Sequence, residues 1–304
     1  MDTAVKEEIK KIMSGAEVLE NESMKKHTTF RVGGNADLYI NIQNVEQLRT
    51  LIPFLNNQLI PFFIKGNGSN LLVSDKGYPG AVLELGASFH EIKVEGFNVR
   101  AMAGALLSQV AKKACDAGLS GFEFAAGIPG TVGGAMVMNA GAYDGEMKQV
   151  VKEVTLFLPE ENVVTVFSKE EMAFGYRTSI LKKKPYIVLD AVFEFVQKDK
   201  QDIINKMADF SARRKEKQPL EFPSAGSTFK RPEGNFAGKL IMDSGLRGFS
   251  IGGAQVSEKH CGFVINKGNA TALDIYRLMK EVQKKVQENS GVVLEPEVIF
   301  LGEF

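Results

Sequence analysis

The sequence has little of what secreted, metal-binding or membrane-spanning proteins depend on. Its 304 residues include two cysteines, Cys115 and Cys261, and no Cys-x-x-Cys motif. One pair makes no disulfide framework and no Cys/His cluster suggests a metal site, so we predict no metal ion and a cytoplasmic protein. No run of about twenty apolar residues is present, so no transmembrane helix is expected. Residues 1–15 lack the apolar core of a signal peptide.

The chain also has no net charge, because 37 Lys and Arg residues balance 37 Asp and Glu residues. This balance argues against a dedicated nucleic-acid binder. It leaves room for local basic clusters that bind an anionic small molecule. A hydrophobic fraction of 44% and a charged fraction of 24% are typical of a globular protein. Nothing in the sequence indicates an obligate protein partner.

Apolar periodicity predicts a mixed chain. Helices are expected near the N-terminus and at 45–58, 108–118, 199–218, 236–243 and 271–289, and strands at 36–42, 60–66, 81–85, 90–95, 98–103, 150–158, 162–167, 186–196, 261–266 and 296–302. Pro53 is expected to bend or break its helix. Several strands follow one another directly, which predicts an α+β fold rather than a regular βαβ chain. The change of character after the charged helix places a domain boundary near residue 200.

A short glycine loop, "KGNGSN" at 65–70, follows a predicted strand. Gly66 and Gly68 can take positive φ and let backbone N–H groups approach an anion closely. The loop is neither a dinucleotide fingerprint opening a helix nor a Walker A loop, because a strand follows it and no Gly-Lys-Ser/Thr is present. An ordinary tight turn explains it equally well.

A second segment, "AAGIPGTVGGAMVMNAGAYDGE" at 125–146, is much richer in glycine. Because glycine loses the most conformational entropy on folding, such density usually reflects close approach to a backbone. A glycine-lined helix crossing is the alternative. Two such segments in one predicted domain favour a dinucleotide held by loops between two β-rich halves.

Six segments in order resemble the UDP-N-acetylenolpyruvoylglucosamine reductase family. They are "HTTFRVGGNADLYI" (27–40), "GNGSNLLVSDKGYPG" (66–80), the second glycine segment, "FGYRTSIL" (174–181), "PSAGSTFKRP" (223–232) and "LEPEVIFLGE" (294–303). Each is weak alone, but together they span nearly the whole chain. No extra tyrosine-bearing loop follows "FGYRTSIL", so the chain resembles the family's shorter subgroup.

The resemblance implies an FAD-binding fold of the vanillyl-alcohol-oxidase (PCMH) type. Residues 1–200 would form the FAD-binding domain, with two α+β subdomains that divide near 65–75, and residues 201–304 a C-terminal α+β substrate-binding domain. The implied contacts with non-covalent FAD fall on Gly66, Asn67, Gly68, Ser69, Asn70, Gly127, Pro129, Gly130, Gly133, Gly134, Ala140, Gly141 and Tyr143.

The reaction that the resemblance implies reduces the enolpyruvyl group of UDP-N-acetylglucosamine enolpyruvate to UDP-N-acetylmuramate, with NADPH as hydride donor. Such a site must stabilise charge beside the substrate carboxylate and deliver a proton to the α-carbon. Arg177 matches the family's carboxylate-binding arginine and Ser227 its proton donor, although either could be an ordinary surface or turn residue. Glu297 matches the family's acid, and we expect nearby Glu295 to raise its pKa.

Further substrate contacts implied by the resemblance fall on Tyr176, Arg214, Lys217 and His260. Arg213, Arg214, Lys217, Lys230 and Arg231 bracket the serine loop and could neutralise a diphosphate, or form a solvated face. Some relatives carry an arginine where this chain has Ile299. His27 and His90 receive no role.

Two other functions remain open from the sequence. An oxidase or dehydrogenase of the same fold would oxidise an alcohol. Such enzymes often tether FAD through His or Cys, and the early glycine loops contain neither residue. A non-catalytic nucleotide-binding module would show no NADPH turnover and would not need Ser227.

Overall fold

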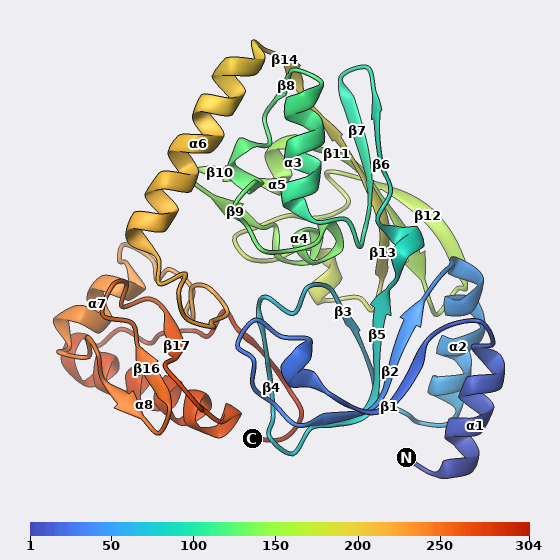
Figure 1. The fold of residues 1–304 in the computed structure, drawn as a ribbon, viewed down its shortest axis with the longest axis horizontal. Coiled ribbons are helices and arrows are strands. Elements are labelled where there is room, and N and C mark those ends of the chain that lie inside the picture. Colours follow the sequence, from blue (N-terminus) through green and yellow to red (C-terminus); the bar gives the residue numbers. More distant parts are fainter. The chain divides into compact units, whose positions relative to one another are not determined.

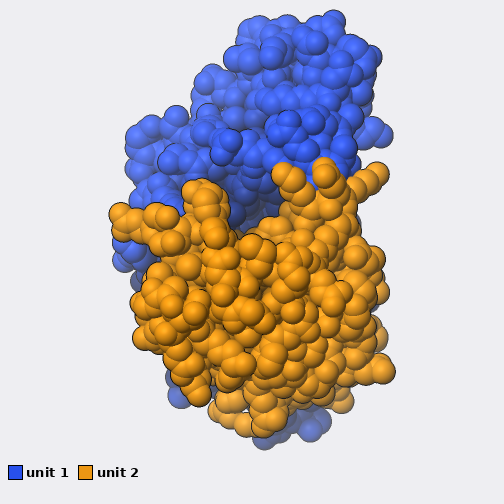
Figure 2. Space-filling model, turned by 90° about the vertical axis from the view of Figure 1, so that its left-hand side faces the viewer, with its two compact units in different colours: residues 1–19, 38–67, 80–214 blue, residues 20–37, 68–79, 215–304 orange.

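The computed structural model describes residues 1–304, which form two compact units, each with its own apolar core. The first unit comprises residues 1–19, 38–67 and 80–214, and the second comprises 20–37, 68–79 and 215–304 (Figure 2). The predicted division at residue 200 does not coincide with these units. Helix α6 (Lys200–Lys217) belongs to the first unit as far as Arg214, because Ile203 is buried and Phe210 packs against that unit's core.

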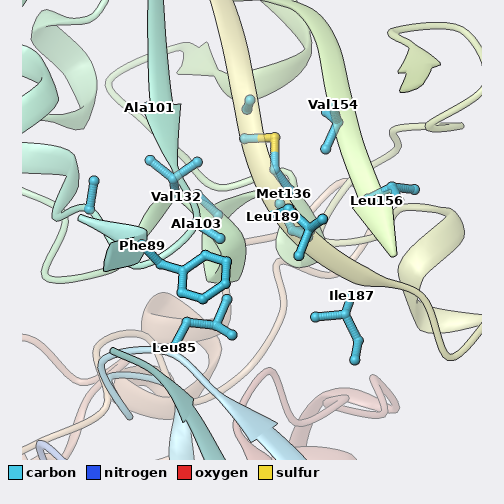
Figure 3. Close-up of a cluster of buried hydrophobic side chains, with 14 of the residues drawn as sticks. Leu85, Phe89, Ala101, Ala103, Val132, Met136, Val154, Leu156, Ile187 and Leu189 are labelled. Atoms are coloured by element: carbon cyan, nitrogen blue, oxygen red, sulfur yellow. The ribbon is translucent and has the colours of Figure 1, made fainter. Parts of the chain in front are cut away.

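A five-stranded antiparallel sheet forms the centre of the first unit. Its order is β12 (Val163–Ser168), β11 (Val151–Leu158), β13 (Ile187–Glu194), β7 (Asn98–Met102) and β6 (Ile92–Glu95). Helices α3 (Leu107–Asp116) and α4 (Val132–Met138) pack against it (Figure 1). Figure 3 shows Val132 and Met136 of α4 among Ala101 and Leu189 of the sheet, all of them buried. The packing fixes α4 inside the second glycine segment, for which the sequence offered a helix crossing only as the alternative.

A second sheet of the first unit has the order β1 (Val18–Ser23), β2 (Asn35–Ile42), β5 (Tyr78–Leu85) and β3 (Phe62–Lys65), with β3 and β5 parallel. Helices α1 (Thr3–Ile12) and α2 (Val45–Asn57) contact each other beside it (Figure 1). Of the two expected effects of Pro53, a bend or a break, the break does not occur, since α2 runs through Pro53 to Asn57. Four buried residues on one face, Leu48, Leu51, Ile52 and Leu55, hold the helix across the proline.

The second unit contains a small antiparallel sheet of β15 (Ser250–Ile251), β16 (Ala254–Val256) and β17 (Val264–Asn266), with helices α7 (Ala237–Asp243) and α8 (Ala272–Ser290). Thr271 and Asp274 form a capping box at the start of α8, and Gly291 ends the helix at φ +73°. Strands β4 (Leu71–Val73) and β18 (Ile299–Leu301) pair in parallel. The chain therefore brings its C-terminal strand onto the segment that follows the first glycine loop.

Short elements complete the chain: strands β8 (Leu119–Ser120), β9 (Gly141–Ala142), β10 (Gly145–Glu146) and β14 (Val196–Gln197), helix α5 (Met147–Val150), and 3-10 turns at Met24–Lys26, Ala87–Phe89, Glu123–Ala125 and Ile180–Lys182. None of the helices combines the length and the apolar sequence that crossing a bilayer requires. No group of three His, Cys, Asp or Glu side chains is arranged to hold a metal ion.

Candidate active site

The two glycine segments touch each other in the first unit. The side-chain amide of Asn67 donates to the Pro129 carbonyl at 2.8 Å. A Cβ on Gly66 would lie 2.5 Å from Thr131 Oγ1, so the absence of a side chain at residue 66 is what allows this approach. Thr131 is the N-cap of α4. The predicted cofactor residues Gly66, Asn67 and Pro129 are thus held together in one place.

A cavity of about 110 Å³ opens where these segments meet. Its lining is contributed by both glycine segments and by the neighbouring strands: Ile64, Lys65, Gly66, Glu84, Leu85, His90, Ala103, Gly104, Thr131, Gly133, Gly134, Val137, Tyr186, Ile187 and Val188. A Cβ on Gly133 would lie 3.2 Å from that of Ala103, whereas one on Gly134 would meet only Thr131 Oγ1, at 3.6 Å. Gly134 therefore leaves open space that the packing of the protein does not require.

The rest of the first glycine loop belongs to the second unit, which the chain enters after Asn67. Gly68 has φ +63°, and a Cβ there would lie 2.1 Å from the His27 carbonyl oxygen. Contact within the protein is thus enough to require a glycine at this position. Asn70 donates its side-chain N–H to the Glu297 carbonyl at 3.0 Å, and its own carbonyl accepts from Ile299 N. A predicted cofactor residue therefore fixes the backbone of a predicted catalytic one.

The remaining predicted cofactor residues of the first unit contact α6 or one another. Tyr143 stacks on Phe210 with ring centroids 4.4 Å apart and donates to the Phe210 carbonyl at 3.0 Å. A Cβ on Gly127 would lie 3.1 Å from the Arg214 guanidinium. Arg214, predicted to bind substrate, thus lies against the second glycine segment, and burial lowers its pKa. Gly141 pairs with Glu146 in the β9–β10 hairpin.

Arg177 lies in a tight turn of the first unit. Gly175 and Thr178 form an isolated bridge around it, and Arg177 takes φ +54°, an uncommon conformation for a residue with a side chain. Its guanidinium donates to the Gly141 carbonyl at 3.3 Å and lies 5.4 Å from the ring centroid of Tyr176, which is 53% exposed. Backbone strain of this kind clusters at functional sites.

A residue that the sequence did not single out, Asn139, organises this region. It is fully buried at the end of α4, with φ +42°. Its amide nitrogen donates to Glu146 Oε2 at 2.8 Å and to the Gly175 carbonyl at 3.0 Å, and its oxygen accepts from Lys148 N at 2.9 Å. Both polar atoms of the Asn139 side-chain amide are thus hydrogen-bonded. Asn139 therefore ties the Arg177 turn to the second glycine segment.

Ser227 and Glu297 lie on adjacent segments of the second unit. Glu297 N donates to the Thr228 carbonyl at 2.9 Å, and Thr228 N donates to the Gly262 carbonyl at 2.9 Å. The hydroxyl oxygen of Thr228, which is buried, accepts from Val264 N at 2.8 Å. These bonds fix the backbone on one side of Ser227. Ser227 itself is exposed.

The expected interaction of Glu295 with Glu297 is replaced by an ion pair. Lys230 Nζ lies 2.8 Å from Glu295 Oε2, and this hydrogen bond lowers the pKa of Glu295. The cause is the backbone: Lys230 N donates to the Glu295 carbonyl, which places the two side chains together. Glu295 is thus kept as a paired anion.

The other predicted substrate residues differ in their surroundings. His260 is partly buried, which lowers its pKa, and its Nδ1 accepts from Gly262 N at 3.1 Å. Lys217 is exposed. In the basic cluster, Arg213 pairs with Asp209 at 2.7 Å, and the Arg231 guanidinium lies 4.0 Å from the ring centroid of Phe236. With Lys230 also paired, the cluster is not a set of five equivalent anion-binding groups.

Comparison with known proteins shows which family this chain belongs to. The family model "UDP-N-acetylenolpyruvoylglucosamine reductase, C-terminal domain" matches residues 218–301, and "FAD binding domain" matches residues 36–166. A UDP-N-acetylenolpyruvoylglucosamine reductase of Caldanaerobacter subterraneus subsp. tengcongensis is 52% identical over 98% of both chains, and one of Lachnoclostridium phytofermentans is 48% identical over 100% of this chain and 99% of the other. The chain belongs to the UDP-N-acetylenolpyruvoylglucosamine reductase family.

A solved member of this reductase family, from Thermus caldophilus, matches with a TM-score of 0.81 at 36% identity, over 94% of this chain and 99% of the other. The predicted fold class, an α+β FAD-binding fold followed by a C-terminal domain, is confirmed. The roles of individual residues stay predictions.

In this reductase-family chain, the lining of the cavity in the first unit suits part of an FAD molecule. Four glycines line the cavity, namely Gly66, Gly104, Gly133 and Gly134, and at Gly134 the packing of the protein leaves the place of a side chain open. Thr131, Lys65 and Glu84 supply polar atoms at its edge. Apolar walls with a few polar groups are typical of cofactor sites, and a cavity of about 110 Å³ holds part of a dinucleotide rather than the whole molecule.

Proposed function

We propose that this protein is an FAD-containing, NADPH-dependent oxidoreductase that reduces UDP-N-acetylglucosamine enolpyruvate to UDP-N-acetylmuramate. The observation that carries this proposal is the match to reductases of that name over nearly the whole chain. The product is a peptidoglycan precursor, so the protein acts in cell-wall synthesis, and through it in cell shape and division. We place it in the cytoplasm, with FAD bound non-covalently and no membrane or nucleic-acid partner.

FAD, when bound, would supply the hydride chemistry between NADPH and the terminal vinyl carbon of the substrate. The residues of the chain must then hold the substrate, stabilise the charge that develops beside its carboxylate and add one proton to the α-carbon. Hydride and proton together convert the vinyl group into a saturated lactyl ether, so atoms and electrons balance. The charge and the proton are the two demands that the site residues must meet.

Arg177 meets the first demand. A guanidinium remains charged at all working pH values and can grip a carboxylate with two parallel hydrogen bonds. The Arg177 turn is fixed from two sides, by the bond from Asn139 to Gly175 and by the bond from Arg177 itself to Gly141. A fixed guanidinium stabilises developing charge without reorganising during the reaction.

Ser227 and Glu297 meet the second demand. A serine hydroxyl is a weak acid and can protonate only a strongly basic carbon that is held close to it. Ser227 is an exposed residue, while the backbone beside it is fixed through Thr228. The Glu297 backbone is held by Thr228 and by Asn70. We assign Ser227 as proton donor and Glu297 as the acid that supports it.

We assign the binding of the UDP-sugar to four residues, some exposed and some partly buried: Tyr176, Arg214, Lys217 and His260. Lys217 is exposed and carries the charge that a diphosphate requires. Tyr176 is half-exposed beside Arg177 and offers an aromatic face. Arg214 contacts the second glycine segment, so it serves the cofactor region as well as the substrate.

Anaerobic half-reactions test this function. The purified protein should be yellow, NADPH should bleach the flavin absorption, and UDP-N-acetylglucosamine enolpyruvate should restore it with formation of UDP-N-acetylmuramate. Reoxidation by an alcohol-derived carbonyl but not by the enolpyruvyl sugar would point to a different oxidoreductase. A colourless protein without NADPH turnover would instead support the alternative of a non-catalytic nucleotide-binding module.

A further inference from the structure

A buried lysine lies under the first glycine loop. Lys65 is the last residue of β3 and follows three apolar residues, Phe62, Phe63 and Ile64, so its charge interrupts an apolar strand. Its side chain is 4% exposed. Lysine is almost never buried to this degree unless it is paired. A buried lysine at this position therefore needs a partner of opposite charge, and its positive charge needs an explanation.

The partner is Glu84, the neighbour of Lys65 in the parallel register of β3 and β5. Lys65 Nζ donates to Glu84 Oε1 at 2.8 Å, and the Tyr39 hydroxyl donates to the other carboxylate oxygen. The ammonium group also lies 5.7 Å from the ring centroid of Tyr39. Charge pairing thus explains how the cation is tolerated, but a well-packed apolar residue would remove the desolvation cost altogether.

A second bond of the ammonium group connects it to the glycine loop. Lys65 Nζ donates to the Gly66 carbonyl at 2.7 Å, which is the length of a charge-assisted hydrogen bond. The chain contains no cis peptide bond, so the N–H of Asn67 points opposite to that carbonyl and away from Lys65. No hydrogen bond within the protein uses the Asn67 N–H. By binding the Gly66 carbonyl, Lys65 therefore fixes the direction of the Asn67 N–H, which points away from the lysine.

Both residues of this bond belong to the cavity wall. Lys65 and Gly66 line the cavity together with Glu84 and Thr131. Asn67 follows this wall as an exposed residue: its side chain donates one N–H to the Pro129 carbonyl, and its backbone N–H makes no hydrogen bond within the protein. Backbone N–H groups of this kind bind anionic groups, and a dinucleotide carries a diphosphate.

We propose that Lys65 is a positioning residue for FAD: its ammonium holds the Gly66 carbonyl so that the Asn67 N–H stays available to an anionic group of the cofactor. The inference rests on the proposed FAD binding. It assigns Lys65 a task that pairing with Glu84 does not explain. The cation acts through the loop rather than through contact with reacting atoms.

Titration of the full-length, flavin-free protein with FAD tests this assignment. Flavin fluorescence gives Kd for the wild type, Lys65→Met, the double variant Lys65→Met/Glu84→Gln, and Tyr39→Phe. The double variant removes both charges while it keeps the side-chain shapes. Tyr39→Phe is the matched control, since it breaks the network at Glu84 but keeps the bond from Lys65 to Gly66.

We expect Lys65→Met and the double variant to bind FAD about ten- to a hundredfold more weakly, the effect of one lost charge-assisted hydrogen bond. Tyr39→Phe should change Kd by less than about threefold. Wild-type affinity in the double variant would overturn the proposal, because Lys65 would then only neutralise Glu84. If the wild type itself fails to bind FAD, the proposed function falls together with this inference. Thermal unfolding of each flavin-free variant identifies any that do not fold, and the double variant decides if Lys65→Met alone unfolds.

Discussion

Arg177 and Ser227 are held in place by different kinds of contact. The Arg177 turn is tied down by side chains, since Asn139 donates to the Gly175 carbonyl and Ser179 Oγ donates to the Val137 carbonyl. The Ser227 segment is tied down mainly by backbone bonds, through the bridges Ser224–Ile265 and Phe229–Pro296, with one side-chain bond in which Thr228 Oγ1 accepts from Val264 N. A backbone ladder survives most single substitutions, whereas a side-chain anchor does not.

This difference has a consequence for the two demands of the reaction. Substitutions near Ser227 should remove its chemistry and leave the fold intact, because its neighbours hold one another through N–H and C=O groups. Substitutions near Arg177 should affect both geometry and stability, because a fully buried amide at Asn139 cannot lose a partner without cost. The following variants test that contrast, starting with the largest expected effect.

Ser227→Ala should separate the two half-reactions. Flavin reduction by NADPH needs no proton from this residue and should keep its rate. Reoxidation by the enolpyruvyl sugar should slow by roughly 10²–10⁴ or more, the scale of losing a positioned acid. Stopped-flow absorbance of the flavin follows each step, and the thermal midpoint should stay near that of the wild type. Equal slowing of both steps would show that the serine shapes the pocket rather than donating the proton.

Arg177→Lys should impair sugar turnover by roughly 10²–10³, because lysine keeps the charge but loses the planar fork that grips a carboxylate. Residue 177 has φ +54° with arginine, and lysine carries the same unbranched Cβ, so backbone strain should not distinguish the two proteins. Steady-state assays with the enolpyruvyl sugar measure the loss, and flavin reduction by NADPH serves as the internal control. Near-normal turnover would remove Arg177 from its proposed role.

Asn139→Asp should slow reoxidation by roughly tenfold, because a carboxylate cannot donate to the Gly175 carbonyl and Arg177 is then less firmly placed. The new carboxyl would also lie beside Glu146, so one of the two is expected to hold a proton. The defect should therefore be larger at high pH, where that proton is lost.

Ser179→Ala is the matched control for Asn139→Asp, since it removes a different side-chain anchor of the same turn. We expect it to lower stability without a change in the pH profile of reoxidation. Identical pH profiles in Asn139→Asp and the wild type would mean that Asn139 does not position Arg177.

Much of the fold was predictable because periodicity reports burial. The helices at 45–57, 200–217 and 272–290 and the strands of the five-stranded sheet formed close to their predicted bounds. Helix α4 was not the favoured interpretation of its segment because glycines weaken its propensity, and the burial of Val132 and Met136 against the sheet stabilises it. Tertiary packing thus overrides local preference in the very segment that carries the predicted cofactor residues.

The site was predictable in its residue types but not in its partners. The glycine segments predict close contacts with the backbone. The local sequence does not predict that Asn67 binds the Pro129 carbonyl, or that the His27 carbonyl requires a glycine at residue 68. Their spacing suggested that Glu295 would raise the pKa of Glu297. The backbone bond between Lys230 and Glu295 instead places the Glu295 carboxylate in an ion pair with Lys230. Asn139 offers no signal at all, because its acceptor at Gly175 lies 36 residues away.

Gly134→Ala should weaken FAD binding by roughly three- to tenfold while it stabilises the flavin-free protein by up to about 1 kcal/mol. The added Cβ makes only ordinary contact with Thr131 within the protein, so its effect should appear against the cofactor. FAD titration and thermal unfolding of the flavin-free variant measure the two changes. A stabilised variant with unchanged Kd would place FAD elsewhere than in this cavity.

His260→Asn should change how stability depends on pH, with the smallest effect of the series. Burial lowers the pKa of His260, so the unfolded chain takes up a proton near pH 6.5 and the folded protein does so only at lower pH. The wild type therefore loses stability as pH falls from 7 to 5, and the variant, which has no such group, should lose up to about 1 kcal/mol less over this range. Above pH 7 the two curves should run parallel.

The variant keeps the local geometry, because an asparagine oxygen can accept from Gly262 N as His260 Nδ1 does. This matters for the contrast between the two regions, since the Gly262 carbonyl receives the bond from Thr228 that holds the Ser227 segment. Urea unfolding at several pH values measures the difference in the free energy of unfolding. If wild type and variant lose the same stability on acidification, His260 is protonated in the folded protein as readily as in the unfolded chain. If the variant instead also loses reoxidation rate at pH 7, the backbone ladder beside Ser227 depends on a side chain after all, and the distinction drawn between the two regions fails.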